Sequence, residues 1–248
     1  MPNMTGNPTL NDKTFSRVPA VASGGTMTIE GAVNKTAILL ALTLLTATYT
    51  WRQFFAGNTG AMGGWAAAGA IGGFIVAMIT CFKYNWAPVT APIYALLEGL
   101  FVGAISAVFE RQMPGIVIPA VMLTFGTLAG LLGAYKLGVI KATPAFQRGV
   151  IAATAGIAIF YLLAIVLRFF HVPIPFINGG GSLGILFSVF VVVIAALNLV
   201  LDFNLIERGA RSGAPKYMEW YAAFSLMVTL IWLYMEILRL LAKLNRRN

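Results

Sequence analysis

The sequence predicts an all-α integral membrane protein, built as a bundle of seven transmembrane helices. Hydrophobic residues make up 59% of its 248 residues and charged residues only 10%, whereas soluble domains carry roughly a quarter charged residues. The mean hydropathy is +0.83. The apolar residues gather in seven runs of about 20 residues, the length that a helix needs to cross a bilayer. This composition argues against a soluble globular domain, a disordered chain and a disulfide scaffold.

The seven runs give the expected helices in chain order. They cover residues 34–55, 65–83, 91–109, 116–136, 149–169, 182–205 and 220–243, so that the membrane domain is 34–243. Residues 1–33 form a polar N-terminal tail without the apolar stretch of a signal peptide, and we expect a short ordered segment at 10–15. Residues 244–248 form a basic C-terminal tail.

Proline positions support these boundaries, because a proline inside a helix removes a hydrogen bond and clashes with the preceding turn. Three prolines lie in the N-terminal tail, and Pro119 lies near the beginning of the fourth run. The others fall in expected connections or at helix starts: Pro88, Pro92, Pro114, Pro144, Pro173, Pro175 and Pro215. We therefore expect no proline at the centre of a helix.

The distribution of basic residues predicts the orientation. The formal net charge is +9, and more Lys and Arg residues lie on the side of the N-terminus than on the opposite side. The positive-inside rule then predicts a cytoplasmic N-terminus and an external C-terminus. The basic C-terminal tail opposes this prediction, and a re-entrant last helix would leave both ends inside. No basic stripe is interleaved with aromatic residues, so no nucleic-acid partner is expected.

Three carboxylates lie within the apolar runs, where each costs roughly 2.5–3.5 kcal/mol to insert. They are Glu98, Asp202 and Glu236. In the predicted orientation Glu98 and Asp202 share a depth near the inner side, whereas Glu236 lies towards the outer end. Helical spacing gives each carboxylate polar companions on its own face: Tyr94 for Glu98, Asn198 for Asp202, and Ser225, Thr229 and Trp232 for Glu236. These stripes predict a shared hydrated interior.

Structural interpretations of the same residues stay open. Glu236 is spaced to pair with Arg239 one turn on, near the membrane interface. Asp202 is placed to meet the inner water at a helix end. Glu98 has no neutralising partner within one turn, so its structural interpretation is a protonated, hydrogen-bonded side chain.

Glycines recur at the spacing that lets helix backbones approach closely in lipid. The pairs are Gly69 and Gly73, Gly99 and Gly103, Gly126 and Gly130, and Gly180 and Gly184. They predict helix packing and carry no chemistry.

Four segments resemble the Bax inhibitor-1 family, in its bacterial YccA-like subgroup. They are residues 6–15 (GNPTLNDKTF), 94–103 (YALLEGLFVG), 198–207 (NLVLDFNLIE) and 223–241 (AFSLMVTLIWLYMEILRLL). The resemblance implies a seven-helix bundle with the last helix at its centre, in the bacterial inner membrane. It also implies a pH-sensitive calcium leak, gated by two aspartates that share a proton, one in the sixth helix and one in the seventh.

The chain matches only half of that aspartate pair. Asp202 stands at the first position, and Thr229 stands at the second. Either Glu98 supplies the second carboxylate or the proton sensor is altered, and a lone Asp202 could instead form a latch with Lys83. Calcium prefers several oxygen ligands, so we expect Asp202 and Glu98 to bind it only weakly and transiently.

Other function classes remain as alternatives. The first alternative is a proton-coupled secondary transporter that uses Glu98 and Asp202. The second is a regulator without transport activity, which binds a membrane protease or another membrane protein through its N-terminal tail. We expect no enzyme and no cofactor: Cys81 is the single cysteine, and Ser182 with the single histidine, His171, fits a helix cap and a loop better than a protease site. The expected partners are the lipid bilayer and calcium ions or protons.

Overall fold

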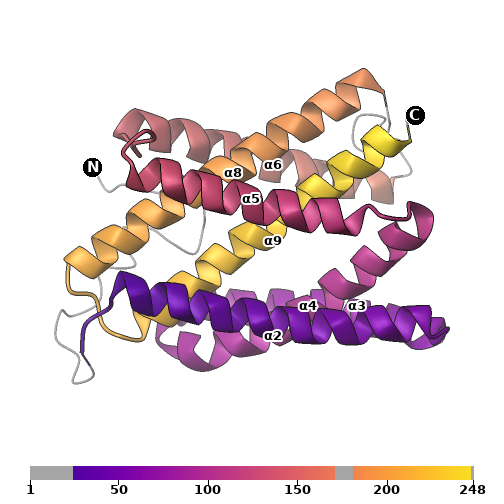
Figure 1. Cartoon of the computed structure of the whole chain (residues 1–248), viewed down its shortest axis with the longest axis horizontal. Coiled ribbons are helices and arrows are strands. Elements are labelled where there is room, and N and C mark those ends of the chain that lie inside the picture. The colour runs from indigo at the N-terminus through magenta and orange to yellow at the C-terminus, as the bar shows by residue number, and fades with distance from the viewer. Residues whose placement is uncertain (1–24, 171–180, 247–248) are drawn as a thin grey trace. The chain divides into compact units, whose positions relative to one another are not determined.

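The computed structural model describes residues 25–170 and 181–246, and it is all-α, as predicted. Its helices are α2 (Ile29–Phe55), α3 (Thr59–Phe82), η1 (Tyr84–Trp86), α4 (Ala87–Gln112), α5 (Val117–Lys136), α6 (Pro144–Phe169), α8 (Ser182–Arg211) and α9 (Met218–Asn245) (Figure 1). Seven of them are long and apolar enough to cross a membrane. The predicted segment at 10–15 and His171 lie outside the described residues.

Several helices are longer than the apolar runs that predicted them. α2 begins at Ile29, inside the predicted tail, because the Thr28 side chain caps it by accepting a hydrogen bond from the Gly31 amide at 2.9 Å. α4 begins at Ala87, directly after η1, so that Pro92 lies inside the first turns of the helix instead of at its start. α8 continues to Arg211, well past Leu205, and α9 continues into the predicted C-terminal tail.

The chain divides into two compact units. Unit 1 contains α5, α6, α8 as far as Asn204, and α9 from Thr229 onward. Unit 2 contains α2, α3, η1, α4, the end of α8 and the first part of α9 up to Val228. α8 and α9 therefore contribute to both units.

Glycine positions bring the helices of unit 2 into close contact. A Cβ atom at Gly99 or Gly103 would overlap the backbone of α2 at Thr43 or Ala47, and one at Gly69 would overlap α4 at Leu97. The predicted role of these glycines in helix packing is confirmed. The prediction is wrong for Gly126 and Gly130 of α5, where nothing in the described chain lies within 4 Å of such a Cβ atom.

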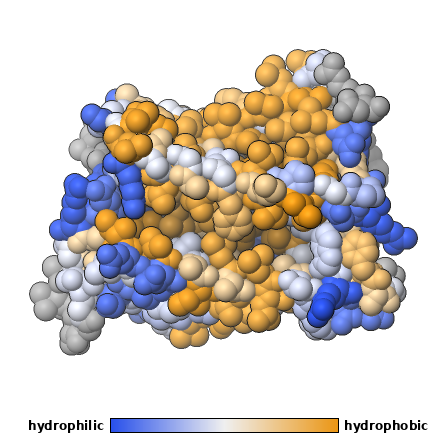
Figure 2. Space-filling model, in the orientation of Figure 1, coloured by the Kyte–Doolittle hydropathy of each residue, from blue (hydrophilic) through white to orange (hydrophobic). Residues whose placement is uncertain are grey.

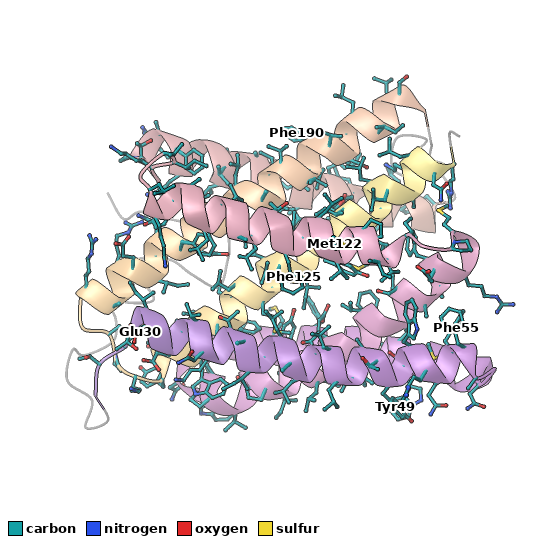
Figure 3. The ribbon with its side chains drawn as sticks, in the orientation of Figure 1. Glu30, Tyr49, Phe55, Met122, Phe125 and Phe190 are labelled. Atoms are coloured by element: carbon teal, nitrogen blue, oxygen red, sulfur yellow. The ribbon has the colours of Figure 1, made fainter. Side chains whose placement is uncertain are left out.

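The outer faces of the helices are apolar. Figure 2 shows hydrophobic residues along the helices and hydrophilic residues gathered at their ends. Large apolar side chains such as Met122 (68% exposed) and Phe190 (47%) extend away from the helix axes (Figure 3). α9 is instead the most buried of the spanning helices, since 61% of its most apolar 18-residue stretch is buried, as the family resemblance implies. The chain is therefore an integral membrane protein whose outer side chains contact lipid.

Candidate functional site

A buried hydrogen bond joins α8 to α9 within unit 1. The Thr229 hydroxyl donates to Oδ2 of Asp202 at 2.7 Å. Asp202 is completely buried and Thr229 is 3% exposed. The interpretation of Asp202 as a water-exposed residue at a helix end is therefore wrong, because α8 continues past it to Arg211 and the carboxylate is enclosed. The two positions that the resemblance pairs do face each other.

Asn198 extends this polar group by one helical turn. Its side-chain amide donates to the Thr154 hydroxyl of α6 and to the Ile194 carbonyl, both at 2.8 Å. Its Oδ1 atom is buried and accepts no hydrogen bond from any described residue. We call Thr154, Asn198, Asp202 and Thr229 the Asp202 cluster, which draws on α6, α8 and α9.

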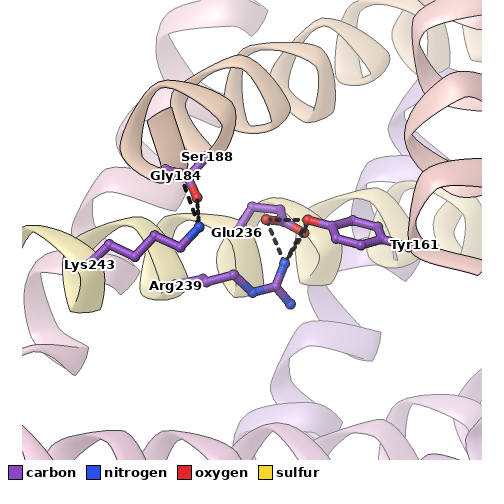
Figure 4. Close-up of polar contacts among 6 residues, drawn as sticks. All are labelled: Tyr161, Gly184, Ser188, Glu236, Arg239 and Lys243. Atoms are coloured by element: carbon purple, nitrogen blue, oxygen red, sulfur yellow. Dashed lines mark hydrogen bonds and ion pairs between the residues drawn. The ribbon is translucent and has the colours of Figure 1, made fainter. Parts of the chain in front are cut away.

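Glu236 belongs to a second polar group on α9. Nη1 of Arg239 donates to Oε1 and Oε2 of Glu236 at 2.7 and 2.8 Å and to the Tyr161 hydroxyl at 2.8 Å. The Tyr161 hydroxyl in turn donates towards the Glu236 carboxylate at 3.0 Å. The three side chains point toward one another in Figure 4, and we call them the Glu236 cluster. The predicted pairing of Glu236 with Arg239 is confirmed.

One turn further along α9, Lys243 is also buried, at 4% exposure. Its ammonium group donates to the Gly184 carbonyl at 3.0 Å and to the Ser188 hydroxyl at 2.9 Å (Figure 4). The contact fastens the end of α9 to the first turns of α8. The sequence pattern did not single out this lysine, because a terminal basic residue of a membrane helix ordinarily extends to the interface.

An apolar layer separates the two polar clusters. Ile157, Val191 and Ile194 are buried together, and Trp232 packs against them. On α6, Ile157 lies between Thr154 and Tyr161, and on α9, Trp232 lies between Thr229 and Glu236. Because each helix presents polar, apolar and polar residues in turn on one face, the seam between α6, α8 and α9 is apolar at its middle. Trp232 accordingly belongs to the apolar layer and not to a polar stripe.

Glu98 lies in unit 2, on the face of α4 that meets α3. It is half-buried, and a Cβ atom placed on Gly73 would come within 3.0 Å of its Oε2 atom. No residue in the described ranges forms a hydrogen bond or ion pair with this carboxylate. Its predicted pairing with Asp202 of unit 1 stays a prediction. So does the Lys83 latch: the Lys83 ammonium group lies over the Trp86 ring, 4.5 Å from its centroid.

Glu219 is a buried acidic residue that the sequence pattern missed. It is fully buried at the start of α9 and accepts hydrogen bonds from the Thr28 amide at 2.9 Å and the Thr28 hydroxyl at 3.0 Å. Lys35 of α2 forms an ion pair with it at 2.5 Å. The sequence offers no signal for this site, because the partners are distant in the chain and Glu219 reads as a polar residue preceding an apolar run.

Metal binding has little support from fixed ligands. In the parts of the chain that the structure describes, no three His, Cys, Asp or Glu side chains gather as they would around a bound metal ion. Weak, transient calcium binding at Asp202 or Glu98 therefore stays a prediction.

Seven membrane-spanning helices, with buried carboxylates on the last two, define the class: a polytopic membrane protein with a polar interior site. Within that class, the model of the Bax inhibitor 1 like family matches residues 7–246, nearly the whole chain. The chain belongs to the Bax inhibitor 1 like family. No curated protein is similar enough to the chain to count as a match.

Proposed function

We propose that the chain is a cation leak channel, with calcium as its main permeant ion, and that protonation of Asp202 and Glu98 controls permeation. The observation that carries the proposal is the complete burial of Asp202, which accepts a hydrogen bond from Thr229 of α9. An ionisable side chain inside a membrane protein is costly to keep and commonly marks an ion pathway.

The chemistry around Asp202 suits weak binding of a hard cation. Calcium takes oxygen ligands, and the Asp202 cluster offers carboxylate, hydroxyl and amide oxygens, including the open Oδ1 atom of Asn198. A site with one carboxylate holds calcium weakly, and permeation requires that an ion leave as readily as it enters.

Thr229 changes the gating that the family resemblance implies. A threonine hydroxyl donates a hydrogen bond to Asp202 but takes no share of a titrating proton pair, as a second aspartate would. The proposal therefore assigns the pH response of this chain to the carboxylates of Asp202 and Glu98. It assigns the chain no catalytic activity and no resident cofactor.

Reconstitution into liposomes with an entrapped calcium indicator tests the proposal. We expect downhill calcium flux in the wild type, independent of a counter-ion gradient, and a changed rate or pH profile in Asp202→Asn and in Glu98→Gln. Glu207→Gln is the matched control, since Glu207 lies on the same helix as Asp202 and pairs with Arg211 at the helix end. Flux curves in which both test variants equal the wild type would overturn the proposal.

The same assay separates the alternative functions. Saturable flux that follows an imposed proton gradient would identify a proton-coupled secondary transporter. Absence of any flux, in protein that is folded and correctly inserted, would leave the regulatory role and direct attention to partners of the N-terminal tail. The proposed location is a bacterial plasma membrane, with the N-terminus in the cytoplasm.

A further inference from the structure

The Glu236 cluster has the geometry of an occupied cation site. Both carboxylate oxygens of Glu236 and the Tyr161 hydroxyl oxygen converge on one atom, Nη1 of Arg239, at 2.7–2.8 Å. A surface ion pair between a glutamate and an arginine on the same helix needs no third ligand from another helix. Here α6 supplies that ligand, and α9 supplies the charge.

Burial in the cluster is unequal. The Glu236 side chain is 2% exposed, whereas the Arg239 side chain is 35% exposed. The Glu236 carboxylate oxygens are therefore enclosed by protein, and the Arg239 side chain that covers them reaches the protein surface. The Tyr161 ring also packs against Phe187, which holds the hydroxyl in place.

The surroundings favour a bound positive charge at this position. The site lies on the same face of α9 as Thr229, and the apolar layer of Ile157, Val191 and Ile194 separates it from the Asp202 cluster. A carboxylate next to such a layer is stabilised only when a cation or hydrogen-bond donors accompany it. In this structure the guanidinium group supplies both.

We infer that Glu236 and Tyr161 form a cation-binding site distinct from Asp202 and that the Arg239 side chain occupies it as a tethered competitor of free cations. The ligand class is a hard cation such as Ca²⁺, which would take the three protein oxygens and complete its shell with water from the side that Arg239 leaves open. The inference deepens the proposed function by adding a second ion position on the same seam. A role of this site in calcium flux rests on the proposed leak function, whereas cation binding at the site does not.

Titration of the full-length, detergent-solubilised protein with Tb³⁺ tests the site directly. Tb³⁺ replaces Ca²⁺ and luminesces when a nearby tyrosine or tryptophan is excited, and Tyr161 is a ligand here. When Arg239 leaves the site open about a tenth of the time, a free cation binds it about tenfold more weakly than it would bind the same site without the arginine. We therefore expect Arg239→Ala to bind Tb³⁺ at least about tenfold more tightly than the wild type, with displacement by Ca²⁺.

Three variants separate a cation site from a structural ion pair. Arg239→Lys keeps a tethered cation and should bind as weakly as the wild type. Glu236→Gln combined with Arg239→Ala should lose the new binding, because the charged ligand is gone. Arg246→Ala removes an exposed basic residue beyond the same end of α9 and should leave binding unchanged, which controls for a simple change in surface charge.

Unchanged Tb³⁺ affinity in folded Arg239→Ala, or a gain that persists without Glu236, would overturn the inference. Arg239→Gln retains a hydrogen-bond donor for Glu236 and takes the place of Arg239→Ala if the alanine variant does not fold. Failure of calcium flux in the liposome assay, together with a gain of Tb³⁺ binding in Arg239→Ala, would remove the leak function and leave the cation site standing.

Discussion

The Thr229 hydroxyl lies 2.7 Å from the Asp202 carboxylate and donates a hydrogen bond to it. Both side chains are buried, and both belong to unit 1. The family resemblance implies an aspartate at position 229, and this chain has a threonine there, whose hydroxyl is a neutral hydrogen-bond donor. The chain therefore keeps a contact between α8 and α9 at this position but has no second titrating carboxylate there.

Thr229→Asp should restore a pair of carboxylates and give calcium flux a steeper pH dependence. Two adjacent carboxylates cannot both ionise cheaply, so that one of them holds a proton until the pH rises. The measurement is the rate of calcium entry into liposomes, compared across buffers from mildly acidic to mildly basic pH. Thr229→Ser, which keeps the hydroxyl donor, is the control and should retain the wild-type profile. A Thr229→Asp profile equal to that of Thr229→Ser would contradict the expectation.

Gly99→Ala should destabilise the protein, whereas Gly126→Ala should not. Alanine favours a helix by roughly 1 kcal/mol over glycine, so a glycine-to-alanine change should stabilise a helix wherever the added methyl group meets no neighbouring atom. At Gly126 nothing in the described chain lies within 4 Å of the added methyl group, but at Gly99 that group would overlap the backbone of Thr43. Thermal unfolding in one detergent should therefore show a lower midpoint for Gly99→Ala and an equal or higher one for Gly126→Ala. A lowered midpoint in Gly126→Ala would show that another surface covers α5.

The apolar runs predicted the number and order of the spanning helices because the hydrophobic length of a bilayer acts on each helix separately. They predicted helix ends less well. α2 starts at Ile29, where Thr28 caps it, and α8 extends to Arg211 through last turns that carry Glu207, Arg208 and Arg211 and therefore fall outside an apolar run. Such ends depend on local side-chain contacts that an apolar run does not encode.

The candidate site was predictable where one helix carries the signal. The spacing of Glu236 and Arg239 on α9 predicted their contact. Partners on other helices were not predictable, since the sequence alone holds no record of which faces meet. Tyr161 beside Glu236, Ser188 beside Lys243, and Thr28 beside Glu219 belong to this class.

The predicted topology can be measured with a single cysteine. Asn58 is exposed between α2 and α3, and with a cytoplasmic N-terminus it lies outside. Asn58→Cys in a Cys81→Ser background should react with a membrane-impermeant maleimide added to intact cells. A cysteine at Lys141, an exposed residue between α5 and α6, is the opposite control and should react only after the cells are opened. Labelling of Lys141→Cys in intact cells, with protection of Asn58→Cys, would reverse the orientation.

Glu219→Ala should be among the most destabilising single substitutions of unit 2. The carboxylate is fully buried, and it satisfies the amide and hydroxyl of Thr28 as well as the ammonium group of Lys35. Removing one partner of a buried pair costs about 3–5 kcal/mol, because the other charge is left uncompensated.

The exposed pair of Glu207 and Arg211 gives the matched comparison, since exposed pairs contribute about 0–1 kcal/mol. Chemical unfolding in detergent should therefore rank Glu219→Ala well below Glu207→Ala in stability. Lys35→Met combined with Glu219→Gln should recover part of the loss, because it leaves no buried charge unpaired and the glutamine still accepts from Thr28. Equal stability of Glu219→Ala and Glu207→Ala would mean that the contact between the starts of α2 and α9 contributes little to the fold.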